Sequence, residues 1–139
     1  MERQFHLLID GKAVEGTSQF DVIKAATGKA FASCPKADES QLNAAVAAAK
    51  KAFPSWSSLP VEQRAEKIEA LAAGLQERAA EFASLLTTEQ GKPLDQAMGE
   101  VIGCTFVMRA FRDMRIEPKT LRDAGGNTVI EHRTPLGVV

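Results

Sequence analysis

The feature that most constrains the fold is an apolar stripe that repeats every seven residues through the middle of the chain. Large side chains stand at Val61, Ile68, Leu75 and Phe82, and smaller or similar ones stand between them at Ala65, Ala72, Ala79 and Leu86. Residues three and four apart lie on one face of an α-helix. The stripe therefore predicts helix with one buried face, and Gly74 or the stretch 78–80 is where it would divide into two helices.

Another helix is predicted before this stripe. Asp38 followed three residues later by Gln41 is typical of a capping box, and an alanine-rich run follows it. The pattern predicts a helix over residues 38–53. Proline inside a helix removes a hydrogen bond and clashes with the preceding turn, so we expect Pro54 to end this helix.

The last helix is predicted after Gly91, which supplies a C-terminal stop, and Pro93, which suits the first turn of a helix. Apolar residues then recur at steps of three and four to about Arg115, and Cys104 stands among them. The predicted helical region is therefore 38–115, and Cys104 is expected on its buried face.

Short strands are predicted on both sides of the helices. Residues 5–35 alternate strand-like runs with glycine-containing turns, and residues 119–134 have the pattern of a hairpin around the turn 123–127. Residues 136–139 are apolar and indicate the start of a strand with no partner of its own, so we expect further strands downstream. The predicted class is α/β, with α+β order in the part present: strands, helices, then a hairpin.

Composition excludes several kinds of partner. Hydrophobic residues make up 45% of the chain and charged residues 25%, with a net charge of -1 and a pI near 6.1. These values are typical of soluble globular proteins and give no attraction to nucleic acid or to an anionic membrane. No signal peptide or membrane span is indicated, so a cytoplasmic location is expected.

A single domain of this length is expected to bury roughly two thirds of its unfolded surface.

The cysteines and histidines give no reaction centre. Cys34 and Cys104 lie far apart without metal-ligand spacing, and neither has a histidine in register to act as a base. We expect both to be free thiols with structural roles. His6 and His132 fall in predicted strands without ligand partners, which favours surface or hydrogen-bonded histidines.

Other polar and aromatic candidates also favour structural roles. Trp56 is expected to anchor the loop after the first helix, and Gly125-Gly126 is expected to form a hairpin turn rather than an anion cradle. Most helix carboxylates, including Glu69, are spaced for solvated faces. Glu89, close to the break at Gly91, is the one carboxylate placed for a further role.

Six motifs in order give a family resemblance. They are Ile9-Asp10-Gly11-Lys12, Ala26-Thr27-Gly28, Ala52-Phe53-Pro54-Ser55-Trp56, Pro60-Val61-Glu62-Gln63-Arg64, Glu89-Gln90-Gly91-Lys92-Pro93 and Arg133-Thr134-Pro135-Leu136-Gly137-Val138-Val139. Together they resemble the N-terminal portion of the NAD(P)-dependent aldehyde dehydrogenase superfamily. The chain 1–139 is thus expected to be an incomplete part of that fold, with helices of the cofactor domain at 38–115 and an oligomerisation-type hairpin at 119–134.

The resemblance implies an oxidoreductase that converts an aldehyde to a carboxylate with NAD or NADP. In the family a cysteine forms a thiohemiacetal, hydride passes to the nicotinamide, and a glutamate activates the deacylating water. Those residues lie downstream in relatives, so no catalytic, cofactor-binding or metal residue is carried over to this sequence. The chain alone is expected to be inactive and to bind no cofactor, while the complete protein is expected to act on a small aldehyde as a homo-oligomer.

Two details follow from the same resemblance. Some members hold a monovalent cation between main-chain oxygens matching Val22 and Ile23 and the carboxylate matching Glu89, with a downstream residue completing the shell. This chain also departs from the family, which usually has Asn-Pro where Lys24-Ala25 stands. The loss of that proline is expected to relax the turn.

Two other hypotheses remain open from the sequence. The chain can be a stand-alone interaction module that docks onto a full-length aldehyde dehydrogenase through its hairpin and helix stripe. It can also be an independent helical domain that binds an unrelated ligand. Co-purification with a longer relative would favour the first, and cooperative melting of a monomer would favour the second.

Overall fold

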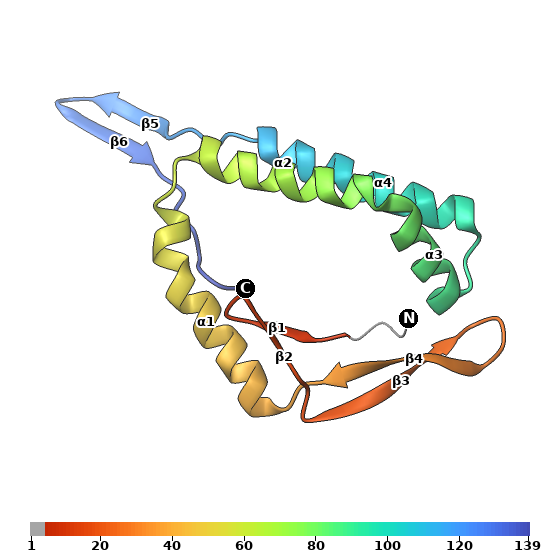
Figure 1. Ribbon diagram of the computed structural model, residues 1–139. Helices are drawn as coiled ribbons and strands as arrows, with labels where there is room; N and C mark the ends of the chain where they lie inside the picture. The colour runs from red at the N-terminus through yellow and green to blue at the C-terminus, as the bar shows by residue number, and fades with distance from the viewer. Residues whose placement is uncertain (1–4) are drawn as a thin grey trace.

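Strands and helices follow one another in the order that the sequence predicts. The computed structural model describes residues 5–139. Its elements are β1 (Leu7–Ile9), β2 (Lys12–Val14), β3 (Ser18–Lys24), β4 (Lys29–Lys36), α1 (Glu39–Ser57), α2 (Val61–Glu77), α3 (Ala79–Gln90), α4 (Leu94–Asp113), β5 (Lys119–Ala124) and β6 (Asn127–Glu131). Strands precede four helices and a hairpin follows them (Figure 1), so the α+β order is confirmed.

The strands form three separate antiparallel pairs. β1 pairs with β2 and β3 with β4, with a bulge between Val22 and Ile23, while β5 pairs with β6 alone. Gly125 and Gly126 form the two-residue turn of the last pair, both at positive φ, which favours glycine. The hairpin expected at 119–134 is confirmed, although its strands end at Glu131.

The capping box at the start of α1 is confirmed. Asp38 accepts a hydrogen bond from the Gln41 backbone N–H at 2.8 Å, and the Gln41 side chain accepts one from the Asp38 backbone. The Gln41 amide also donates to the Glu15 carbonyl at 2.8 Å. The same residue therefore starts the helix and fastens the turn between β2 and β3 to it.

The prediction that Pro54 ends α1 is wrong, because the helix continues to Ser57. Pro54 lacks the N–H that would donate to the Lys50 carbonyl, so the bond that it removes precedes it and the chain after it can still form the last turn. The serines that come next donate hydroxyl hydrogen bonds to carbonyls at this end of the helix. Ser55 donates to the Ala52 carbonyl at 2.9 Å and Ser58 to the Ser55 carbonyl at 3.0 Å.

The helical stripe divides at Arg78 and then stops at Gly91. Arg78 separates α2 from α3, as the sequence allows, and Gly91 takes the left-handed conformation that the predicted stop requires. The last helix, α4, ends at Asp113, two residues before the predicted end. Helix α4 packs against both α2 and α3 (Figure 1).

Small residues make up the buried core of these helices. The buried apolar side chains are Ala65, Ala72, Ala79, Ala83, Ala97 and Val101, and Thr105 is buried as well. The large members of the stripe are only half-buried or exposed. Alanines let helix backbones approach closely, so the helices meet through the small half of the predicted stripe.

The chain buries less surface than expected for its size. Its accessible surface is 10535 Å², whereas a compact monomer of this mass exposes about 7000 Å². Folding therefore covers about half of the unfolded surface rather than the expected two thirds. Figure 1 shows the reason: the elements lie around the periphery of the molecule instead of stacking in layers.

Residues 136–139 do not form the strand that their apolar sequence predicts. The segment from His132 to Val139 is irregular, and Leu136 and Val139 are almost fully exposed. A strand exists only when a neighbour accepts and donates its backbone hydrogen bonds, and no described strand pairs with this one.

None of the helices in residues 5–139 is both long enough and apolar enough to cross a bilayer.

Candidate functional site

A cluster of charged side chains joins α2 to α4. Glu69 on α2 accepts hydrogen bonds from Arg109 Nε at 3.1 and 3.2 Å and from Arg112 Nη1 at 2.6 Å, both on α4. Arg109 also donates to Gln76, seven residues after Glu69, at 2.9 Å. Because residues seven apart share a helix face, Glu69 and Gln76 together meet the arginines of α4.

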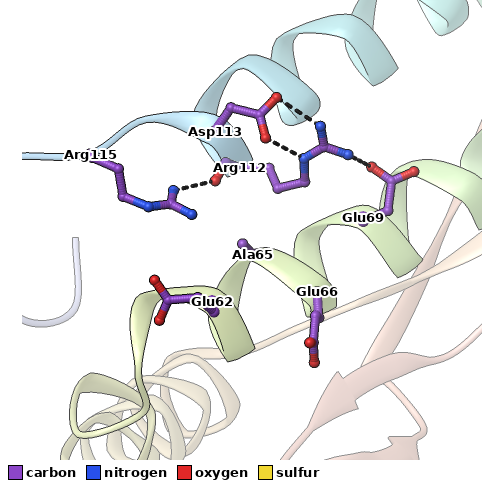
Figure 2. Close-up of a pocket in the computed structure, with 7 residues that line it drawn as sticks. All are labelled: Glu62, Ala65, Glu66, Glu69, Arg112, Asp113 and Arg115. Carbon is purple, nitrogen blue, oxygen red and sulfur yellow. Dashed lines mark hydrogen bonds and ion pairs between the residues drawn. The ribbon is translucent and has the colours of Figure 1, made fainter.

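The second carboxylate of the cluster is Asp113, at the end of α4. Arg112 donates from Nε and Nη2 to the two oxygens of Asp113, each at 2.7 Å. Figure 2 shows the Arg112 guanidinium between Asp113 and Glu69. All three nitrogens of Arg112 therefore have acidic partners.

These contacts keep the cluster fully ionised near neutral pH. The hydrogen bond from Arg109 is the largest influence that lowers the pKa of Glu69, with Arg112 adding to it. The hydrogen bond from Arg112 lowers the pKa of Asp113 and, in return, raises the pKa of Arg112. A carboxylate with a lowered pKa is a poor proton acceptor at neutral pH, so the cluster favours a structural link over acid–base catalysis.

A cavity of about 430 Å³ borders the cluster. It is lined by Glu62, Ala65, Glu66, Glu69, Arg112, Asp113 and Arg115 (Figure 2). Neither a cysteine nor a histidine lines it. Its wall therefore offers carboxylate and guanidinium groups but no thiol.

Glu69 is the residue whose role the sequence prediction misjudged. The sequence predicts a solvated helix face for Glu69, whereas the structure places it at the centre of the link between α2 and α4. The available signal was the pair Arg109 and Arg112, three apart and therefore on one face of a helix already rich in apolar residues. Two arginines at that spacing on a packed helix indicate an acidic partner on the neighbouring helix.

The two cysteines stand on different elements, and neither lines the cavity beside the charged cluster. Cys34 is half-buried in β4, opposite Phe20 of β3. Cys104 is exposed on α4, which corrects the expectation that it lies on the buried face. The buried positions of α4 are instead Ala97, Val101 and Thr105, a row of four-residue steps that leaves Cys104 outside it.

The remaining candidates lie apart from one another. His6 Nδ1 is 3.0 Å from a carboxylate oxygen of Glu15, while His132 is exposed in the irregular C-terminal segment. Trp56 is 41% exposed in the last turn of α1 rather than in a loop. Residues 5–139 contain no group of three or more histidine, cysteine, aspartate or glutamate side chains placed to hold a metal.

The end of β3 does lie beside the end of α3, where the cation hypothesis needs them. The Ala25 N–H donates to the Thr88 carbonyl at 3.1 Å, next to Glu89. A proline at position 25 could not make this bond, since it has no N–H. The turn itself is closed by the Lys24 carbonyl, which accepts from Thr27 and Gly28. The side chain of Thr87 has a buried hydroxyl without a hydrogen-bond partner among the described residues. The cation stays a prediction.

Comparison with known proteins identifies the class to which this arrangement belongs. The chain superimposes on a solved E. coli NADP-dependent enzyme with a TM-score of 0.85 and 29% identity, over 90% of this chain and 27% of that one. It also matches PnpE in complex with nicotinamide adenine dinucleotide, with a TM-score of 0.83 and 30% identity, over 89% of this chain and 26% of that one. The class is therefore defined by a fold that this chain shares in part with these two proteins.

The sequence narrows this class to one family. The profile described as "Aldehyde dehydrogenase family" matches residues 13–139. A "Probable aldehyde dehydrogenase" of Pseudomonas sp is 35% identical over 136 residues, which are 97% of this chain and 28% of that protein. The chain belongs to the aldehyde dehydrogenase family and spans little more than a quarter of the length of such relatives. The family predicted from the six motifs is confirmed.

Proposed function

We propose that the complete protein oxidises an aldehyde to a carboxylate with NAD or NADP through a cysteine thiohemiacetal, and that this chain provides its N-terminal scaffold. The observation that carries the proposal is the family match over residues 13–139 of a chain equivalent to 28% of a relative. Similar structures are described as NADP-dependent or as a complex with nicotinamide adenine dinucleotide. The cofactor would accept the hydride, and the residues of the complete protein would position it.

We further propose that the described residues alone do not carry out that chemistry, and the position of the cysteines supports this. A thiolate nucleophile needs a nearby base or positive charge, and neither Cys34 nor Cys104 lies in the charged cluster or in a cavity beside it. The arginines that line the cavity around Glu69 are held mainly by carboxylates and carbonyl oxygens of the chain itself. We therefore expect the 139-residue chain to show no dehydrogenase activity.

An activity assay tests this expectation. The purified chain would be mixed with NAD or NADP and a panel of aldehydes that includes malonate semialdehyde and lactaldehyde, and reduced cofactor would be followed by fluorescence. A full-length relative is the positive control. We expect no reduction above the buffer rate. Turnover that persists in the pure chain and disappears in Cys34→Ala or Cys104→Ala would overturn the proposal.

A further part of the proposal is that the complete protein is a cytoplasmic homo-oligomer, and the hairpin supports the oligomer. Strands β5 and β6 pair only with each other and project from the helices (Figure 1). Leu121, Val129 and Ile130 on them are each about half exposed. Apolar side chains on an isolated hairpin are costly in water, which favours burial against another subunit.

The oligomer can be tested in the complete protein. Leu121→Asp combined with Ile130→Asp would place charge on the proposed contact, whereas Arg122→Gln between them is the control. Light scattering coupled to size-exclusion chromatography should show dissociation for the double variant only. An unchanged mass would contradict the assignment of the hairpin to an interface.

A further inference from the structure

A second cavity lies where α2 begins and α4 ends, beside the irregular segment after β6. Its volume is about 580 Å³, within the range of small-molecule sites. Seven apolar side chains line it: Val61, Ala65, Ile68, Phe111, Met114, Ile116 and Pro135. Four arginines stand on the same wall, at positions 64, 112, 115 and 133, against the single carboxylate of Glu117. The cavity therefore combines an apolar interior with an excess of positive charge.

Two of the four arginines are already neutralised. Arg112 uses all three guanidinium nitrogens on Asp113 and Glu69. Arg133 Nη2 lies 2.9 Å from a carboxylate oxygen of Glu131. A ligand that paired with either would have to displace a carboxylate of the chain.

Arg64 and Arg115 differ from these, because their described partners are backbone carbonyls. Arg64 donates from Nη1 to the carbonyls of Ser57 and Leu59. Arg115 donates from Nη1 to those of Arg112 at 2.8 Å and Met114 at 3.0 Å. In residues 5–139 no carboxylate forms an ion pair with either arginine, although Arg115 acts on Asp113 at longer range.

The geometry leaves both arginines able to accept an anion. A guanidinium has five N–H donors in a fixed fork, and each of these arginines uses only Nη1. The bonds to carbonyls fix the side chains without neutralising them, so their position is set in advance. Carboxylate is the planar anion that matches two N–H groups of one guanidinium.

We infer that this cavity binds a small organic carboxylate, whose charged end pairs with Arg115 and Arg64 and whose apolar part lies against Phe111, Met114 and Ile116. The site is separate from the proposed dehydrogenase chemistry and does not depend on it. Both the charge and the apolar contact are required. A neutral molecule of the same shape binds less well, and a free inorganic anion lacks the apolar contact.

Hexanoate is the test ligand, and 1-hexanol is its matched neutral probe. Isothermal titration of the 139-residue chain should give saturable binding of hexanoate at least about tenfold tighter than that of hexanol. Binding should weaken as salt is added, because an ion pair is screened. Equal binding of the two probes, or no saturable binding of hexanoate, would overturn the inference.

Variants of Arg115 locate the site. Arg115→Gln should weaken hexanoate binding about tenfold or more, and Arg115→Lys, which keeps the charge without the fork, should fall between. Arg122→Gln on the hairpin is the control and should bind as the parent does, since Arg122 is exposed and does not line the cavity. Far-UV circular dichroism confirms equal helix content.

A second measurement does not depend on the variants. Methyl resonances of Met114 and Ile116 should shift on addition of hexanoate, whereas those of Leu8 on β1 should not. Shifts at Leu8 of the same size would show general adsorption to exposed apolar surface and would also overturn the inference.

Discussion

Arg109 Nε lies 3.1 Å from Oε1 of Glu69, a residue forty positions earlier in the chain. This contact crosses from α4 to α2 beside an interface whose buried side chains are otherwise small, most of them alanines. Alanine side chains allow close approach but offer few specific contacts along the helix axis. The ion pairs of Glu69 therefore fix the register of two helices whose apolar contact is narrow.

Replacing Glu69 by glutamine tests this link. Glu69→Gln keeps the shape but removes the charge that Arg109 and Arg112 share. We expect a lower midpoint of thermal unfolding, measured by circular dichroism, because charge-assisted hydrogen bonds become weaker neutral ones. Glu66→Gln is the control, since Glu66 is exposed on the same helix and should change the midpoint little. Equal midpoints for the two variants would contradict the assigned role.

Acid should weaken the same link. The pKa of Glu69 lies below its usual 4.5 and that of Asp113 below its usual 3.8. A depressed pKa in the folded state means that the stabilisation is fully present above the unfolded pKa and is lost as the pH falls through the folded value. Helix content followed from about pH 6 to pH 2 should therefore drop below pH 4.5.

The variant Glu69→Gln combined with Asp113→Asn separates this effect from general acid unfolding. Amides do not titrate, so the double variant should lose less stability between neutral and acid pH than the parent chain. A parent and a variant with the same pH dependence would show that the two carboxylates do not contribute to acid sensitivity.

Local signals in the sequence predicted the element boundaries well. Asp38 and Gln41 form the predicted capping box, and Gly91 takes the left-handed conformation that a helix stop requires. Each depends on groups only a few residues apart. The prediction for Pro54 is wrong because a proline removes only the bond from its own position to the preceding turn, and α1 continues past it to Ser57.

Burial and pairing between helices could not be predicted in the same way. The stripe contains both alanines and large residues, and the periodicity alone does not say which half meets another helix. The structure buries Ala72 and leaves Phe111 60% exposed, and it places Cys104 outside the contact. The partners of Glu69 could not be predicted for the same reason. Arg109 lies forty residues later on α4, and the sequence does not show which face of α4 packs against α2.

Gly16 gives a prediction that depends on backbone packing. A Cβ at this position would lie 2.7 Å from both N and O of Lys36, which are backbone atoms that cannot move aside. Gly16→Ala should therefore separate the start of β3 from the end of β4 and lower the unfolding midpoint. Native-state hydrogen exchange should speed up at Thr17, whose N–H donates to the Lys36 carbonyl.

Gly74 is the matched control for that glycine. It lies within α2, and a Cβ there meets nothing within 4 Å. Gly74→Ala should stabilise the chain by up to about 1 kcal/mol, because alanine favours helix over glycine. The two alanine variants should thus move the midpoint in opposite directions, and a destabilised Gly74→Ala would show that the surroundings of α2 are more crowded than its structure indicates.

The alanine contact between the helices can be tested by enlarging one of its members. Ala72 on α2 has no exposed surface, while its neighbour Ala73 is exposed. Ala72→Leu should force the packed helices apart at a cost of about 1–3 kcal/mol, since a filled interface accommodates extra methyl groups poorly. Ala73→Leu adds the same atoms in solvent and should change stability by less than about 0.5 kcal/mol. Chemical denaturation of both variants measures the difference. If Ala72→Leu were as stable as Ala73→Leu, the helices would have room between them, and the close alanine contact would not hold the fold together.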